Sequence, residues 1–302
     1  MKFLTYRYLN EQSIGILSKD EQFVIEISQI LSGKRFEQMV DFIKTVTEEE
    51  LRLIEGFILK QKESNETPSH YIPLQSVRVC SPIERPIHDI ICIGVNYEAH
   101  LDESKRAFGS DRFKDTVSAV YFSKRASRIM GPEDEIDGRL DLDEDLDYEV
   151  ELAVIIGKEG KNIPKDQVED YIFGYTILND ISQRTLQKKH NQWYRGKSLD
   201  THTAMGPVIL HKSALALPLE VDIECSVNGE VRQKSNTRLL IHDIKELISE
   251  FSEGITLEPG DIIATGTPAG VGMSYTPKRY LKKGDKVCCK IQGIGELNNL
   301  IK

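Results

Sequence analysis

The chain has no apolar run of the length that a membrane-spanning helix requires. Such a helix needs roughly 20 consecutive, mainly apolar residues, and every hydrophobic stretch here is shorter. The opening segment, MKFLTYRYLNEQSIGIL, also lacks the continuous apolar centre of a secretory signal peptide. We therefore expect a cytoplasmic protein that does not enter a membrane.

Clusters of basic residues are missing as well, and the formal net charge at pH 7 is −9. Nucleic acids and anionic membrane surfaces are bound mainly through clustered Lys and Arg side chains. The charge pattern therefore argues against nucleic acid or a membrane as the main partner.

The five cysteines are odd in number and include no C-x-x-C pair. Disulfide frameworks need paired cysteines, and structural zinc sites commonly contain a closely spaced pair. The pattern predicts reduced, mostly buried thiols in a reducing compartment. The cysteines are Cys80, Cys92, Cys225, Cys288 and Cys289.

Internal repeats and low-complexity tracts are also absent, and 302 residues suffice for one large domain or for a large and a small one. Short β-rich runs at 3–9, 13–17 and 23–27 precede apolar residues at helical spacing over 36–46. This pattern predicts a small α+β unit at the N-terminus.

A polar stretch, 60–69, has the composition of a linker or exposed loop. We place a domain boundary near Pro73. The prediction is a small N-terminal α+β domain over 1–73 and a larger domain over 74–302.

The larger domain alternates short β-rich runs with turn-forming clusters, and its clearest helical segments are 164–171 and 242–251. A regular strand–helix alternation is missing, so a doubly wound parallel sheet is disfavoured. We predict an α+β, mainly β fold with a mixed or antiparallel sheet. The expected strands are 89–94, 119–123, 148–157, 174–180, 208–210, 221–227, 261–264 and 286–291.

Two acidic residues in segment 148–157, Glu149 and Glu151, are two positions apart. Residues i and i+2 of a strand share a face, so these carboxylates project together. Like charges at this distance repel each other unless a cation or donor neutralises them. A third acid, Asp180, ends a second strand-like run. Three carboxylates without nearby Cys or His favour Mg²⁺ or Mn²⁺, whereas the alternative is a solvated sheet face.

The acidic stretch 141–147 superficially resembles a calcium-binding loop. However, Leu146 stands where that loop needs glycine, and Leu152 stands where it needs a bidentate glutamate. We interpret the stretch as a solvated acidic turn.

Five segments in the same order resemble the fumarylacetoacetate hydrolase superfamily over about two-thirds of the chain. The resemblance is strongest to bacterial two-domain members named 2-hydroxyhepta-2,4-diene-1,7-dioate isomerase or oxaloacetate decarboxylase. It implies a mixed β-sandwich roll for the larger domain, a homodimer, and a divalent metal held by Glu149, Glu151 and Asp180. The segments are ICIGVNYEAHLDE (91–103), LDYEVELAVIIGK (146–158), FGYTILNDISQRTLQ (173–187), RGKSLDTHTAMGPVI (195–209) and LEPGDIIATGTPAGVG (257–272).

His100 and Glu103 are three residues apart, so on a helix they share a face and can hydrogen-bond. A carboxylate that holds one imidazole nitrogen raises the basicity of the other, which suits a general base. The resemblance implies that this pair is catalytic and lies on a lid over the site. Segment 104–116, which belongs to the same lid region, offers no further signature.

The resemblance also implies that Lys197 is an active-site lysine, where its charge would stabilise an enolate. Arg184 and Gln187 follow Asp180 by four and seven residues, so a helical turn would bring them towards the metal. By resemblance they contact the substrate carboxylate, and Thr267 lies in a loop that forms a pocket wall. The alternative for the charged residues is an ordinary surface position.

Two positions depart from the family pattern. Val95 stands where many relatives have a basic residue, and Thr203-Ala204 replaces the commoner Cys-Pro. These departures leave the metal site unchanged but predict a different substrate pocket.

We expect a metal-dependent enzyme that cleaves a C–C bond in a small 2-oxo acid, through an enolate stabilised by Mg²⁺ or Mn²⁺. The reaction would be oxaloacetate decarboxylation or acylpyruvate-type hydrolysis. One alternative is an isomerase or tautomerase of 2-hydroxyhepta-2,4-diene-1,7-dioate-type substrates, and another is a metabolite-binding scaffold with vestigial activity. His100 and Glu103 favour cleavage, because proton transfer alone needs no activated water.

Overall fold

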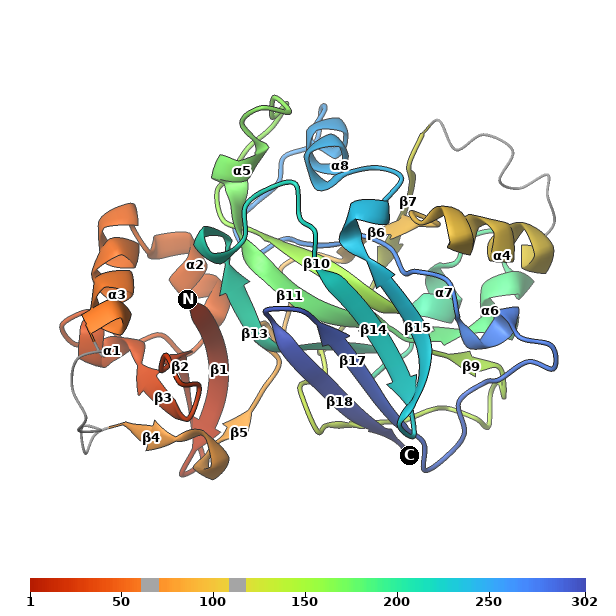
Figure 1. Cartoon of the computed structure of the whole chain (residues 1–302), viewed down its shortest axis with the longest axis horizontal. Coiled ribbons are helices and arrows are strands. Elements are labelled where there is room, and N and C mark those ends of the chain that lie inside the picture. Colours follow the sequence, from red (N-terminus) through yellow and green to blue (C-terminus); the bar gives the residue numbers. More distant parts are fainter. Residues whose placement is uncertain (61–70, 109–117) are drawn as a thin grey trace.

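The computed structural model describes residues 1–60, 71–108 and 118–302 (Figure 1). In this part of the chain a mixed sheet of eleven strands forms the centre, in the order β4-β3-β2-β1-β13-β11-β10-β16-β6-β7, with β5 paired to β1. Only β6 and β16 run parallel among these described pairs. The strands are β1 (Lys2–Tyr8), β2 (Glu11–Leu17), β3 (Phe23–Glu26), β4 (Ile72–Pro73), β5 (Arg78–Val79), β6 (Ile90–Gly94), β7 (Val120–Lys124), β10 (Val150–Ile156), β11 (Ile172–Asp180), β13 (Thr203–His211) and β16 (Ile262–Ala264).

A second sheet, in the order β15-β14-β17-β18-β8, packs on the first where β14 and β17 contact β10 and β11 (Figure 1). A short ladder of β9 with β12 lies apart from both sheets. The fold is therefore α+β and mainly β, as predicted. These strands are β8 (Glu135–Ile136), β9 (Leu146–Asp147), β12 (Ser182–Gln183), β14 (Asp222–Val227), β15 (Glu230–Asn236), β17 (Lys286–Ile291) and β18 (Gly295–Ile301).

The helices lie around the sheets and are short, apart from two (Figure 1). Of the helix predicted over 164–171, only the last four residues are helical. The first part is a turn, in which Gln167 N–H donates to Pro164 O. The helices are α1 (Ile27–Ile30), α2 (Met39–Thr45), α3 (Glu48–Lys60), α4 (Glu98–Phe108), α5 (Val168–Tyr171), α6 (Arg184–Lys189), α7 (Tyr194–Lys197) and α8 (Ile244–Phe251), with 3₁₀ turns η2 (Leu74–Ser76), η4 (Lys212–Ala214), η5 (Thr237–Leu239) and η6 (Gly272–Ser274).

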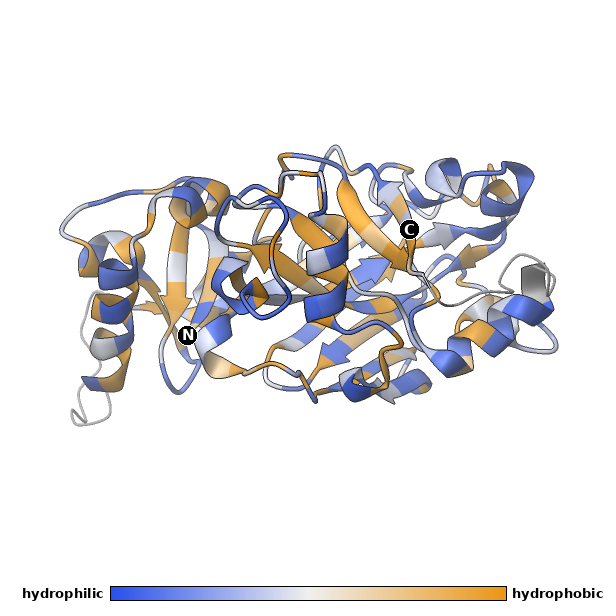
Figure 2. Cartoon of the chain, turned by 90° about the horizontal axis from the view of Figure 1, so that it is seen from above, coloured by the Kyte–Doolittle hydropathy of each residue, from blue (hydrophilic) through white to orange (hydrophobic). Residues whose placement is uncertain are grey.

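The central sheet has an apolar core on each face. All seven residues of β10 are buried; Leu152 and Val154 face the core shared with the second sheet. Ala153 and Ile155 face the other core, which α2 and α3 cover. Figure 2 shows apolar residues concentrated in these central strands. Strands buried on both faces hold their ends in fixed positions, and the acidic residues of β10 lie at one such end.

The N-terminal strands continue the central sheet, because β1 pairs with β13 at Lys2↔Leu210 and Phe3↔Ile209. The predicted strands of this unit correspond to β1, β2 and β3. Residues 61–69 of the predicted linker, 60–69, lie outside the described residues. The domain boundary at Pro73 stays a prediction.

The composition led to predictions about the cysteines and about membrane-spanning helices. All five cysteines are free, and all except the half-buried Cys288 are buried, as predicted. None of the helices in the described residues combines the length and apolar character that a membrane span needs.

Replacing Ile177 with Ala is expected to lower the free energy of unfolding by about 2–5 kcal/mol, because this fully buried residue packs at the centre of β11. Leu53→Ala is the control, since Leu53 is 57% exposed and should change stability by about 0.5 kcal/mol or less. Denaturant unfolding measures both. Equal losses in the two variants would contradict the assignment of the core.

Candidate active site

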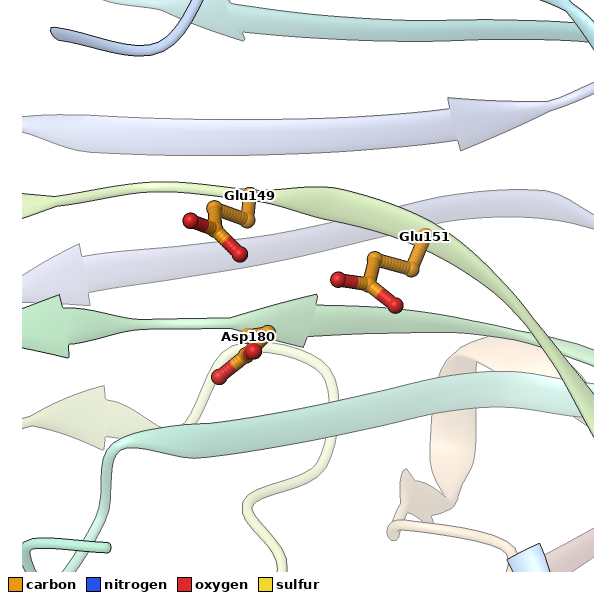
Figure 3. A group of neighbouring side chains, drawn as sticks. All are labelled: Glu149, Glu151 and Asp180. Carbon is orange, nitrogen blue, oxygen red and sulfur yellow. The ribbon is translucent and has the colours of Figure 1, made fainter. Parts of the chain in front are cut away.

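Three carboxylates meet where β10 and β11 pair. Glu149 directly precedes β10, Glu151 lies within it, and Asp180 ends β11. The antiparallel register places Glu151 opposite Leu178, and Asp180 N–H donates to Glu149 O at 2.8 Å. Figure 3 shows the side chains of Glu151 in β10 and of Glu149 just before it extending towards Asp180. One oxygen from each carboxylate lies within 4.8 Å of the others, and all three residues are buried.

Glu151 has the least compensated charge of the three. Its carboxylate accepts a hydrogen bond from Gly266 N–H at 2.8 Å. Burial, followed by the charges of Asp180 and Glu149, raises the pKa of Glu151 well above its usual value. A nearby cation would reverse this shift and let the carboxylate ionise.

Lys197 joins the other two carboxylates. Its Nζ lies 2.6 Å from Glu149 Oε2 and 2.6 Å from Asp180 Oδ2. Burial disfavours the charge of Lys197, but the two carboxylates outweigh that effect and raise its pKa. The ammonium group is therefore charged and fixed among the acids, in the region where the sequence placed it.

A second buried lysine, Lys124 at the end of β7, was not predicted. Its Nζ lies 2.6 Å from Asp180 Oδ1. It also donates to Ile181 O at 3.1 Å and to the backbone carbonyl of Lys197. Lys124 thus holds both the third carboxylate and the backbone that carries Lys197. A single lysine ending a short strand gives no sequence signal for this position.

Arg184 and Gln187 lie on α6 and face the carboxylates, as the spacing predicted. Arg184 Nη1 lies 2.6 Å from Glu149 Oε1 and donates to Gln187 Oε1 at 3.0 Å. Burial would raise the pKa of Glu149, but Lys197 and Arg184 outweigh it and lower that pKa to about 2. Glu149 is therefore ionised at neutral pH.

The interpretation of 141–147 as a solvated acidic turn is wrong for two of its acids. Asp147 is fully buried and accepts from Arg184 Nε at 2.9 Å and from the backbone N–H groups of Gly272 and Met273 at 2.6 and 3.0 Å. Asp143 is also buried and accepts from the Leu186 N–H in α6. The i+2 spacing of the two glutamates extends back to Asp147, and that signal could have identified it.

His100 and Glu103 lie on α4, and their side chains meet with His100 Nδ1 at 3.3 Å from Glu103 Oε2. Glu103 also accepts from Gly270 N–H at 3.1 Å. The helix is therefore attached to the loop that follows β16. His100 is nearly completely buried, and its catalytic role stays a prediction.

Thr267 lies in the same loop, and its hydroxyl has structural partners. It donates to Val150 O at 2.9 Å and accepts from Gln233 Nε2 at 2.7 Å. The side chain forms part of the cavity wall, and its hydroxyl fixes the loop against β10.

These groups surround one small cavity of about 20 Å³, which is room for about one water molecule. A substrate with several carbon atoms therefore requires the wall to move. Besides the carboxylates Glu149 and Glu151, the lining residues are Ile93, Gly94, Val95, His100, Ser104, Phe122, Arg184, Gln187, Trp193, Lys197, Thr267 and Met273.

The buried charges around the cavity do not balance in the described residues. Four buried carboxylates stand against three buried cations, so one negative charge is in excess when all of these groups are ionised. The carboxylates are Asp147, Glu149, Glu151 and Asp180, and the cations are Lys124, Arg184 and Lys197. A hard divalent ion with oxygen ligands fits both the excess charge and the donor atoms.

Comparison with known proteins relates the site to a family. The family model described as "Fumarylacetoacetate (FAA) hydrolase C-terminal" matches residues 89–302. Over the full length of both proteins, the chain is 40% identical to oxaloacetate tautomerase YisK from Bacillus subtilis (strain 168).

Solved structures of similar proteins match this chain over its whole length. A fumarylacetoacetate hydrolase from psychrophilic Exiguobacterium antarcticum is 36% identical, with a TM-score of 0.81 over 100% of this chain and 99% of that one. Maleylpyruvate hydrolase from Sphingobium sp. SYK-6, in complex with manganese (II) ion and pyruvate, is 29% identical, with a TM-score of 0.76 over 100% and 98%.

Glu151→Gln is expected to abolish tight binding of Mg²⁺ or Mn²⁺ while making the metal-free protein more stable, by about 1–3 kcal/mol. Both effects follow from removing a poorly compensated buried charge. Calorimetric metal titration and denaturant unfolding measure them, with the exposed Glu253→Gln as the control. Unchanged metal affinity in Glu151→Gln would rule out this ligand set.

Lys197→Met should have the opposite effect on metal affinity. The ammonium group binds two of the three carboxylates and would repel a bound metal ion. Two unit charges about 4 Å apart interact by about 4 kcal/mol at an effective dielectric constant of 20. Removing the ammonium group should tighten metal binding by roughly tenfold or more, although activity is lost. Weaker metal binding in the same titration would show that Lys197 supports the ion instead of competing with it.

Proposed function

Because the chain belongs to the fumarylacetoacetate hydrolase family, we propose that it enolises short 2-oxo acids with a divalent metal and acts as an oxaloacetate tautomerase. The observation that carries this proposal is the buried carboxylate cluster surrounded by Lys197 and Arg184. The 40% identity to an oxaloacetate tautomerase over the full chain supports the choice of substrate.

Mg²⁺ or Mn²⁺ would be held by Glu149, Glu151 and Asp180, and would supply Lewis-acid polarisation of a 2-oxo acid. The oxygen-only donor set suits either ion. Manganese is favoured by the similar maleylpyruvate hydrolase structure that contains it.

Arg184 binds a substrate carboxylate in this proposal. Its planar guanidinium is held by Asp147 on one side and by Gln187 on another, so little side-chain freedom is lost on binding. Lys197 places a fixed positive charge beside the oxygen on which negative charge develops during enolisation. Such preorganised charges in a dry site are a major source of catalysis.

His100 moves the proton. Glu103 binds Nδ1, so Nε2 is the ring nitrogen that exchanges a proton with C3 of oxaloacetate. In the keto-to-enol direction His100 takes a proton from C3 and solvent water gives one to the keto oxygen; His100 then returns its proton to the hydroxide that is left. The reverse direction follows the same steps backwards. The substrate carbon skeleton and its redox state are unchanged.

Cleavage of a C–C bond is the second candidate, by decarboxylation of oxaloacetate or hydrolysis of an acylpyruvate. One observation favours it: the cavity beside the His100–Glu103 pair has room for about one water, which such a base could activate. Enolisation is common to both reactions, so the same site residues serve either.

The test follows the enol absorbance of oxaloacetate and, in parallel, pyruvate release, with Mg²⁺, Mn²⁺ or chelator. Wild-type protein with metal should accelerate enol–keto conversion, and His100→Ala should slow it roughly 10²–10⁴-fold. His190→Ala, an exposed histidine, should behave as wild type. Metal-dependent pyruvate release that exceeds enol conversion would favour cleavage, and neither activity with metal bound would overturn the proposal.

A further inference from the structure

The cavity beside the carboxylates has two chemically different sides. Arg184, Lys197 and the acids make one side polar. The other side is an apolar wall formed by Val95, Phe122 and Trp193, which pack together with Leu101.

Aromatic contacts make this wall compact. The rings of Phe122 and Trp193 meet edge to face, with centroids 5.1 Å apart. Trp193 also lies against Gly94, where an added Cβ would come within 2.5 Å of the indole ring. The wall therefore presents closely packed apolar groups to the cavity.

Val95 is held in this wall by a costly backbone conformation. Its φ is +59°, a left-handed value that β-branched residues rarely adopt. The next residue, Asn96, is fully buried; its side chain donates to His242 O at 3.1 Å and to Thr265 O at 2.9 Å, and accepts from His242 N–H at 2.8 Å. Asn96 thus fixes the chain just after β6 and presents Val95 to the cavity. Such strain persists where the surroundings impose it, often at functional sites.

We propose that Val95 is a specificity-determining residue, which disfavours 2-oxo dicarboxylates that are longer than oxaloacetate and would place their distal charge on the apolar wall. This inference rests on the proposed function, because it assumes that the 2-oxo acid end binds at the carboxylate cluster. The remaining carbon chain then faces the apolar wall.

The cost of removing a charged group from water explains why a long 2-oxo dicarboxylate would bind poorly. A carboxylate placed against Val95, Phe122 and Trp193 would lose its hydration without gaining a cationic partner. Among the described lining residues, the arginine and the lysine are Arg184 and Lys197. Lys197 Nζ lies 5.4 Å from the centre of the Phe122 ring, but this ammonium group is already paired with Glu149 and Asp180. Oxaloacetate is short enough for both of its carboxylates to stay on the polar side. A longer 2-oxo dicarboxylate must place its second charge on the wall.

Two 2-oxo acids of equal length test the proposal: 2-oxohexanoate ends in a methyl group and 2-oxoadipate in a carboxylate. Trp193 is the chain's single tryptophan, so its fluorescence reports binding at the wall without any turnover. With Mg²⁺ present, wild-type protein should bind 2-oxohexanoate about tenfold or more tightly than 2-oxoadipate. The same acids should inhibit oxaloacetate conversion in that order.

Val95→Lys should reverse or abolish this preference, because it supplies a cation on the wall. Lys can adopt the left-handed backbone at no greater cost than a β-branched residue, so the variant should fold. Val95→Met is the matched control, since it adds similar length without charge and should keep the preference for 2-oxohexanoate.

The outcomes separate the two proposals. Equal affinity of the two acids for wild-type protein, or an equal change in Val95→Met and Val95→Lys, would overturn the role of Val95. Tight, selective binding without any oxaloacetate conversion would support that role and count against the proposed reaction instead.

Discussion

The electrostatic cost of burying three carboxylates together is the constraint on which the rest of the site depends. Glu149, Glu151 and Asp180 lie at the end of two strands that are covered on both faces, so water cannot screen their repulsion. Lys197 and Arg184 offset part of the negative charge. Glu151 is the carboxylate with the least compensation. This uncompensated negative charge explains why the site fits a divalent cation.

The cations that offset the carboxylates come from segments far apart in the sequence. Their ion pairs therefore also connect these segments to the central sheet. Lys124 comes from β7, Arg184 from α6 and Lys197 from α7. Each is held by further partners: Lys124 binds backbone carbonyls, and Arg184 binds the buried Asp147. Asp147 in turn holds the backbone at Gly272. Loss of the charge of Arg184 or Asp147 would therefore disturb α6 and the loop at Gly272 as well as the three carboxylates.

The polar cluster and the apolar wall assign different tasks to the two sides of the cavity. In the proposed function, charge on one side binds a 2-oxo acid and stabilises its enolate. In our proposal, the wall around Val95 disfavours substrate chains that end in a charge, because that charge would lose its hydration there. The proposed chemistry therefore rests on the acidic cluster, whereas the proposed choice among related substrates rests on a residue outside that cluster.

The sequence by itself determined the mainly β fold, the shared face of Glu149 and Glu151, and the direction of Arg184 after Asp180, because strand and helix periodicity are local. It could not identify Lys124, whose partners are distant in the chain, and it misassigned Asp147, because solvation depends on what packs over a turn. Tertiary structure alone decided which carboxylate lacks a cation and that Val95 lies in a strained conformation beside Trp193. Charge compensation and strain of this kind arise from contacts between distant segments, and periodicity does not encode them.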